Sequence, residues 1–161
     1  MTRILVLSDS HKNIINMRRA VSIERPDMIF HLGDFYQDAI KLMTEFPDIP
    51  MEAVNGNCDH DQFHTEKLIT VEGKKIFMCH GHFHHVKTDY LNLEYAAREK
   101  GAEIALCGHT HRIFYDYHNR VYIMNPGSIG APRGPGGPSY GILTIEKGKI
   151  FIQTVFLDNM K

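Results

Sequence analysis

Short apolar runs that end in polar motifs are the feature that most constrains the fold of this 161-residue chain. The runs at residues 3–8, 28–32 and 51–54 are short and rich in large apolar residues, which predicts buried strands. Residues 13–24 and 36–46, which lie between them, have the pattern of helices, with Asn13 as a cap and Pro26 as a stop. The order strand, helix, strand, helix, strand predicts a parallel sheet with helical crossovers.

The rest of the chain has the pattern of three hairpins and one more crossover. The hairpins are expected at 66–71 with 75–79, at 112–117 with 120–124 around a His118-Asn119 turn, and at 140–145 with 149–156. A helix at 89–100 precedes a buried strand at 104–107. Residues 125–139 hold five glycines and four prolines and predict a shaped surface loop. We therefore expect one α/β domain over residues 1–161, with two facing sheets and helices outside.

Composition favours a soluble protein with no charged surface for nucleic acid or membrane. The formal net charge is −1 with histidine neutral, and lysines and arginines are scattered. The three cysteines are widely spaced, which argues against a zinc knuckle and a disulfide framework. The first apolar run is too short for a signal peptide or a membrane span. We expect a cytoplasmic location.

The polar motifs that follow the apolar runs hold side chains that bind metals. In open α/β sheets, ligands collect at the carboxyl ends of the strands, so these side chains should converge on one edge. Glycine permits close backbone approach, and it adjoins the motifs at Gly33, Gly56, Gly81 and Gly108. The candidate metal ligands are Asp9, His11, Asp34, Asn57, His80, His109 and His111.

This donor set suits two neighbouring divalent ions and suggests metal-assisted hydrolysis. Four imidazoles argue against calcium and magnesium and favour manganese first, with iron, zinc or nickel as alternatives. Asp34 could bridge the two ions, since a carboxylate has two oxygens. The net charge of two divalent ions, the Asp9 and Asp34 carboxylates and a bridging hydroxide would be about +1. This positive charge is enough to attract an anionic phosphoester.

The ordered motifs resemble those of the calcineurin-like metallophosphoesterases. They are Asp-x-His, Gly-Asp, Gly-Asn-x-Asp, His-Gly-His and Gly-His-x-His, and they span nearly the whole chain. The chain length, with Asn125-Pro126-Gly127-Ser128 and Pro132-Arg133-Gly134, is similar to the small prokaryotic phosphodiesterase branch.

This resemblance implies a four-layer αββα sandwich of two mixed sheets flanked by helices, with a dinuclear centre. It implies further that a metal-bridging hydroxide attacks phosphorus in line with the leaving group. Asp34 and Asn57 would be catalytic as well as metal-binding. The resemblance places Asp9, His11, Asp34 and His111 on the first metal, and Asp34, Asn57, His80 and His109 on the second.

One position departs from the broader family. Cys58 stands where that family has a histidine that neutralises the leaving group or binds phosphate, and a neutral thiol replaces an imidazolium poorly. The small branch is similar in carrying cysteine there, so activity need not be lost. The source of the leaving-group proton stays open among His82, Asp59 and water.

Two function classes follow from these residues. The leading hypothesis is a metal-dependent phosphodiesterase that acts on a small phosphoester. The alternative is a metal-binding scaffold similar to the small retromer subunit, which Cys58 motivates. A single-metal hydrolase of other esters would leave the second ligand set unused. Arg133 is expected either to bind phosphate or to be a solvent-exposed loop residue. His31 is expected in a hydrogen-bonded interior position. The oligomeric state stays open, with a homodimer as one possibility.

Overall fold

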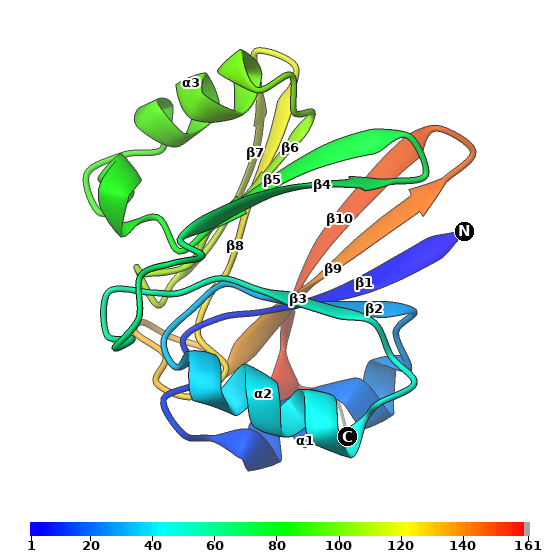
Figure 1. Ribbon diagram of the computed structural model, residues 1–161, viewed down its shortest axis with the longest axis vertical. Coiled ribbons are helices and arrows are strands. Elements are labelled where there is room, and N and C mark those ends of the chain that lie inside the picture. Colours follow the sequence, from blue (N-terminus) through cyan, green and yellow to red (C-terminus); the bar gives the residue numbers. More distant parts are fainter. Residues whose placement is uncertain (160–161) are drawn as a thin grey trace.

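Two five-stranded sheets face each other in the computed structural model of the chain, which describes residues 1–159 (Figure 1). The strands of the first sheet are β1 (Thr2–Leu7), β2 (Met28–His31), β3 (Met51–Ala53), β9 (Ser139–Glu146) and β10 (Lys149–Phe156), and those of the second are β4 (Glu66–Val71), β5 (Lys74–Cys79), β6 (Ile104–Leu106), β7 (Ile113–His118) and β8 (Val121–Pro126). Their orders are β10-β9-β1-β2-β3 and β4-β5-β6-β8-β7.

Helices cover the outer face of each sheet (Figure 1). α1 (Ile14–Glu24) and α2 (Tyr36–Glu45) pack on the first sheet, and α3 (Leu91–Glu99) packs on the second. Asn13 caps α1, since its side chain accepts a hydrogen bond of 3.0 Å from the Asn16 N–H. No helix within residues 1–159 has the length and apolarity that crossing a bilayer requires. The predicted four-layer αββα sandwich is confirmed.

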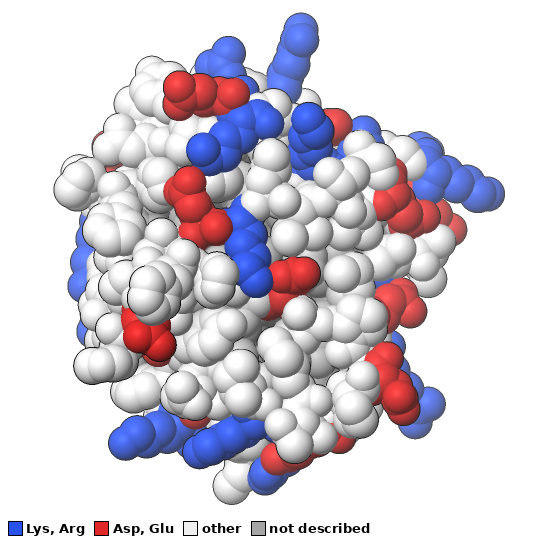
Figure 2. Space-filling view, in the orientation of Figure 1, with Lys and Arg blue, Asp and Glu red and all other residues white. Residues whose placement is uncertain are grey.

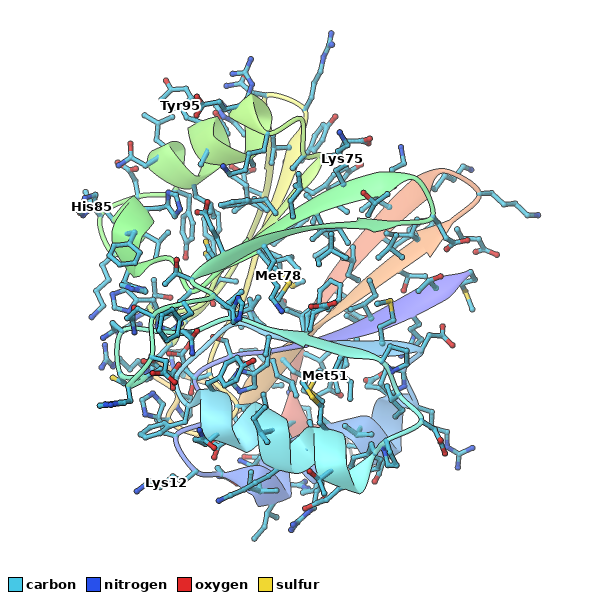
Figure 3. The ribbon with its side chains drawn as sticks, viewed as in Figure 1. Lys12, Met51, Lys75, Met78, His85 and Tyr95 are labelled. Atoms are coloured by element: carbon cyan, nitrogen blue, oxygen red, sulfur yellow. The ribbon has the colours of Figure 1, made fainter. Side chains whose placement is uncertain are left out.

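Side-chain alternation along β1 shows how one strand serves two cores. Ile4 and Val6 enter the cluster between the sheets, while Leu5 and Leu7 point to the other face and pack under α1 and α2. Met78 of β5 also lies between the sheets (Figure 3). A third apolar cluster lies between the second sheet and α3. Four layers therefore enclose three apolar interfaces.

The strand directions bring several carboxyl ends to one edge of the sandwich. β1, β2 and β3 run parallel, as do β5, β6 and β8. The three predicted hairpins are confirmed as β4–β5, β7–β8 and β9–β10. The loops after β3 and β5 both lie on the left in Figure 1, where the two sheets open. The polar motifs follow these strand ends.

The ends of the predicted helices and strands lie within two residues of those observed, and two of the differences have local reasons. The β7–β8 turn falls at Asn119 and Arg120, not at His118-Asn119, because these two residues have the positive φ of 48° and 66° that a two-residue hairpin turn requires. α3 starts at Leu91, not residue 89, because Asp89 accepts the Leu91 N–H at 2.9 Å. A 3₁₀ turn, η1 (His82–His84), was not predicted.

Charged side chains are mixed on the surface. On the face shown in Figure 2, lysines and arginines are interspersed with aspartates and glutamates, with wide uncharged areas between them. This distribution agrees with the scattered basic residues of the sequence.

Candidate metal centre

Four of the candidate ligands meet where the two sheets open. Ligand atoms of Asp9, His11, Asp34 and His111 all lie within 4.8 Å of one another. Asp9 and Asp34 follow β1 and β2 of the first sheet, and His111 follows β6 of the second. The cluster therefore joins both halves of the sandwich.

Two further histidines lie against the same carboxylates. The His80 Nε2 is 3.4 Å from the Asp34 Oδ2 and 3.7 Å from the Asp9 Oδ1. The His109 ring lies 5.0 Å from the His80 ring, and the His109 backbone N–H donates to the Asp9 Oδ2 at 3.0 Å. Six of the seven candidate ligands thus lie in one cluster, four histidines around the Asp9–Asp34 pair.

Asn57 is the candidate that the structure leaves outside. Its side chain is exposed, and its amide donates to the Cys58 Sγ at 3.7 Å. The next backbone N–H along the chain, that of Cys58, donates to the Asp34 Oδ1 at 2.9 Å. The loop therefore contacts the cluster through its backbone, while the carboxamide stays at the rim.

Hydrogen bonds orient two imidazoles toward the carboxylates. The His80 Nδ1–H donates to the Leu32 carbonyl at 2.8 Å, and the His111 Nδ1–H donates to the Ala131 carbonyl at 2.6 Å. Each ring therefore turns its Nε2 lone pair inward, which is the usual arrangement of a histidine that binds metal. The His111 Nε2 lies 3.1 Å from the Asp9 Oδ1.

Several buried polar atoms in the cluster have no hydrogen-bond partner within residues 1–159. They are the Asp9 Oδ1, the His11 Nε2 and the His80 Nε2. Buried acceptors without a donor are costly, and divalent cations bound here would satisfy them. The nitrogen and carboxylate donors fit a divalent transition metal.

The electrostatics of the cluster favour ionised carboxylates. Burial alone would raise the pKa of Asp9, but His11, His111 and His80 outweigh it and hold the pKa well below its usual range. The pKa of Asp34 is lowered in the same way, against burial, by His80 and the Cys58 N–H. The Asp9 carboxylate in turn raises the pKa of His111, so protons compete with metal for that nitrogen.

The backbone is strained where the ligands sit. Left-handed φ values are sparsely populated by residues other than glycine, and they cluster at functional sites. Five candidate ligands have such values: Asp9 (54°), His11 (43°), Asp34 (45°), His109 (72°) and His111 (60°). The fold therefore has to hold these residues in place.

Asp59 supplies part of this support. Its carboxylate accepts the backbone N–H groups of Asp34 at 3.1 Å, Tyr36 at 2.6 Å and Gly56 at 2.6 Å. Both oxygens are thus occupied by donors, so Asp59 has the geometry of a positioning residue and not of the proton donor considered from the sequence.

Residues 125–139, rich in glycine and proline, also support the ligand segments, a role that the sequence analysis did not identify. The Asn125 Nδ2 donates to the Gly108 carbonyl at 2.9 Å and to the Thr110 Oγ1 at 3.0 Å. The Ser128 Oγ donates to the Asp9 carbonyl at 2.8 Å. Polar residues between glycines and prolines were the available signal.

A buried chain of hydrogen bonds supports the first motif. The neutral His31 ring accepts the Gly33 N–H at 3.2 Å, and its Nε2–H donates to the Ser10 Oγ at 2.9 Å. The Ser10 hydroxyl donates to the Asp38 Oδ2 at 2.7 Å. Burial lowers the pKa of His31 to about 4, which keeps the ring neutral. The interior position expected for His31 is confirmed, but Asp38 was not identified from the sequence.

His82 has a ring with unused hydrogen-bonding capacity. Both ring nitrogens are shielded from solvent and have no partner within residues 1–159. Its ring lies 5.5 Å from that of His80 and 6.0 Å from that of His109. Burial, followed by His80, lowers the pKa of His82, so the ring is neutral.

Cys58 is poorly suited to a reactive role. Burial, then the Asp34 carboxylate, raises the pKa of its thiol to about 11. The thiol therefore stays protonated near neutral pH and is neither a thiolate nucleophile nor a strong acid.

Comparisons with known proteins agree with the geometry. The model of the calcineurin-like phosphoesterase superfamily domain matches residues 2–148. Probable metallophosphoesterase YsnB of Bacillus subtilis (strain 168) is 36% identical over 150 residues, which cover 89% of this chain and 84% of that protein. Phosphodiesterase MJ0936 of Methanocaldococcus jannaschii is 27% identical over 165 residues, covering 90% and 94%.

A solved structure extends the comparison. The crystal structure of a conserved uncharacterized protein and predicted phosphoesterase of Streptococcus pneumoniae TIGR4 superposes with a TM-score of 0.80. The two chains are 28% identical, and the match covers 98% of this chain and 90% of the other.

Substitution of Gly108 tests whether close backbone approach sets the ligand geometry. A Cβ at this position would lie 1.9 Å from the Ser8 Oγ and 2.6 Å from the Asp9 Oδ2. We expect Gly108→Ala to displace the Asp9 carboxylate and to weaken manganese binding by at least about 10-fold, measured by calorimetry.

Gly148→Ala is the matched control, because a Cβ there meets nothing within 4 Å. It should cost about 1 kcal/mol of stability through its positive φ and leave metal affinity unchanged. Equal metal affinity in Gly108→Ala and the wild type would contradict this account of the cluster.

Proposed function

Because the chain belongs to the calcineurin-like phosphoesterase superfamily, we propose that it is a metal-dependent phosphodiesterase with a centre for two transition-metal ions. The observation that carries this proposal is the set of four histidines around the buried Asp9–Asp34 pair. The relative from Methanocaldococcus jannaschii that is named a phosphodiesterase supports the choice of reaction.

The ligands divide into two sets that share Asp34. Asp9, His11 and His111 would hold one ion with Asp34, in the cluster that already lies within 4.8 Å. His80, His109 and Asn57 would hold the other ion with Asp34, and the exposed Asn57 side chain would have to turn inward to join. The nitrogen-rich donor set favours manganese, iron, zinc or nickel.

Divalent ions bound here would polarise the phosphoryl oxygens and lower the pKa of water. The protein's own groups set the charge. Asp9 and Asp34 are ionised, so the loaded centre keeps a small positive surplus that suits the single charge of a diester. Asp59 keeps Asp34 in its strained conformation through the backbone.

We assign His82 to the leaving group. Its neutral ring lies beside His80 and His109, and both ring nitrogens lack a partner among the described residues. A neutral N–H can stabilise a developing oxyanion by donating a hydrogen bond. The Cys58 thiol, with its pKa raised to about 11, and the Asp59 carboxylate, whose oxygens accept backbone N–H groups, do not offer this capacity. Water then supplies the proton.

Replacing Asp34 tests the enzymatic proposal. An amide has one acceptor oxygen and cannot serve both ions, so Asp34→Asn should lower kcat/KM on bis(p-nitrophenyl) phosphate by more than about 100-fold and reduce the bound manganese. Asp61→Asn, on an exposed loop residue, is the control and should keep both. An Asp34→Asn protein with full rate and full metal content would refute the assignment.

The same assay separates the enzyme from the scaffold. Wild-type protein that binds two ions and hydrolyses no phosphodiester or monoester in a substrate panel would favour the metal-binding scaffold. Turnover that requires manganese and disappears in Asp34→Asn favours the enzyme.

The role of His82 is tested by varying the leaving group alone. Methyl p-nitrophenyl phosphate has a good leaving group, and methyl phenyl phosphate has a poorer one that depends more on a hydrogen-bond donor. We expect His82→Ala to lose at least about 10-fold more kcat/KM on the phenyl ester than on the p-nitrophenyl ester. His60→Ala, at an exposed loop residue, should lose neither. Equal losses on both esters would exclude this role for His82.

A further inference from the structure

A cavity of about 780 Å³ lies beside the metal cluster, between the segment that leads into α3 and strand β7. This volume is in the range of small-molecule sites. Thr110, which stands between His109 and His111 in the sequence, forms part of its wall. Arg133, another wall residue, donates its backbone N–H to the His111 carbonyl at 3.0 Å. The cavity therefore borders the candidate metal centre without containing it.

One wall of the cavity is aromatic and fixed in orientation. The rings of Tyr90 and Phe114 are stacked, with centroids 4.0 Å apart and an interplanar angle of 11°. The Tyr90 hydroxyl accepts a hydrogen bond of 3.4 Å from the Asn125 Nδ2, the same amide that holds the Gly108 carbonyl. Leu91 and Ile113 extend this apolar wall. Flat aromatic ligands bind such surfaces by stacking and apolar contact.

The end of the cavity nearest the metal cluster is cationic. Lys87, Arg112 and Arg133 line it, and the lysine and arginine ion pairs found within residues 1–159 involve other side chains. Burial, then His80 and Lys87, lowers the pKa of His109, so the Lys87 charge lies within electrostatic range of that ring. Arg112 and Arg133 also line a smaller cavity of about 250 Å³ that His111 borders. Three cations that pair with no carboxylate in the described part of the chain suit a phosphate.

The carboxylates of the cavity have hydrogen-bond or ion-pair partners within the protein. Glu94 pairs with His118 and accepts from the Asn119 side chain at 3.0 Å. Asp89 accepts the Leu91 N–H. Asp116 accepts the N–H of its own neighbour, Tyr117, at 2.8 Å. Because His118 lies six residues beyond Arg112 along extended chain, the Glu94–His118 pair is about 20 Å from Arg112. Asp89, two residues after Lys87, lies nearer the cationic end.

We propose that this cavity binds the non-reacting half of the substrate and that this half is a nucleotide carrying a second phosphate. Its base contacts the Tyr90–Phe114 wall, and its second phosphate contacts Lys87, Arg112 and Arg133. The inference rests on the proposed phosphodiesterase function and deepens it by naming the substrate class.

The reaction balances without a further reactant. A water oxygen forms a bond to phosphorus, and the bond from phosphorus to the leaving oxygen breaks with its electron pair on that oxygen. The proton lost by water goes to the leaving alcohol or to solvent. The nucleotide remains in the cavity as a phosphomonoester until it dissociates.

Three p-nitrophenyl diesters with one leaving group test the proposal on the manganese-loaded protein. They are methyl p-nitrophenyl phosphate, thymidine 5′-(p-nitrophenyl phosphate) and the same thymidine ester with a 3′-phosphate. We expect kcat/KM to rise about 10-fold when the nucleoside is added and about 10-fold again with the 3′-phosphate.

Single substitutions assign each gain to its wall. Arg112→Ala should remove most of the gain from the 3′-phosphate, and Phe114→Leu should remove most of the gain from the base. Arg98→Ala on α3 and Tyr115→Leu on β7 are the matched controls, since neither side chain lines the cavity. Because each gain is a ratio between probes on one protein sample, partial unfolding of a variant cancels.

The outcomes separate this inference from the proposed function. If the wild type hydrolyses all three probes with equal kcat/KM, or if both cavity variants keep both gains, the nucleotide site is overturned and the phosphodiesterase stands. If no probe is hydrolysed, the phosphodiesterase is overturned, and calorimetry with thymidine 3′,5′-bisphosphate decides the cavity. Binding that Arg112→Ala weakens at least about 10-fold would support it, and absent or unchanged binding would refute it.

Discussion

Two buried carboxylates facing unpaired imidazole nitrogens are the constraint on which the rest of this structure depends. Asp9 and Asp34 lie at the ends of neighbouring parallel strands, and the His80 Nε2 approaches both. Among the residues that the structure describes, the buried Asp9 Oδ1 and His80 Nε2 have no hydrogen-bond partner. Unsatisfied buried polar atoms of this kind are expected at functional sites. The second sheet packs against the first and completes the site with His80, His109 and His111.

Polar residues that are not candidate metal ligands hold the ligands in their strained backbone conformations. Asp59 holds three backbone N–H groups around Asp34, and Asp38 holds Ser10 beside Asp9. Ser128 reaches the Asp9 carbonyl from a loop more than a hundred residues away in sequence. A left-handed φ costs of order 1–3 kcal/mol at a residue other than glycine. These hydrogen bonds offset that cost and hold the ligands in their strained conformations.

The sequence was most informative where chemistry follows secondary structure. Apolar period and length located the strands, and the rule that ligands gather at carboxyl ends located the candidate ligands. It was least informative about contacts between distant segments. The Asp59 clamp, the exposed Asn57 amide and the cavity wall of Tyr90 and Phe114 depend on side-chain positions that no local pattern encodes.

The number and place of the metal ions test the central claim most directly. Anomalous diffraction from crystals of the manganese-loaded protein would locate each ion independently of any activity. The account predicts two ions that share Asp34, one beside Asp9, His11 and His111 and one beside His80, His109 and Asn57. A single ion, or ions bound away from Asp34, would contradict it.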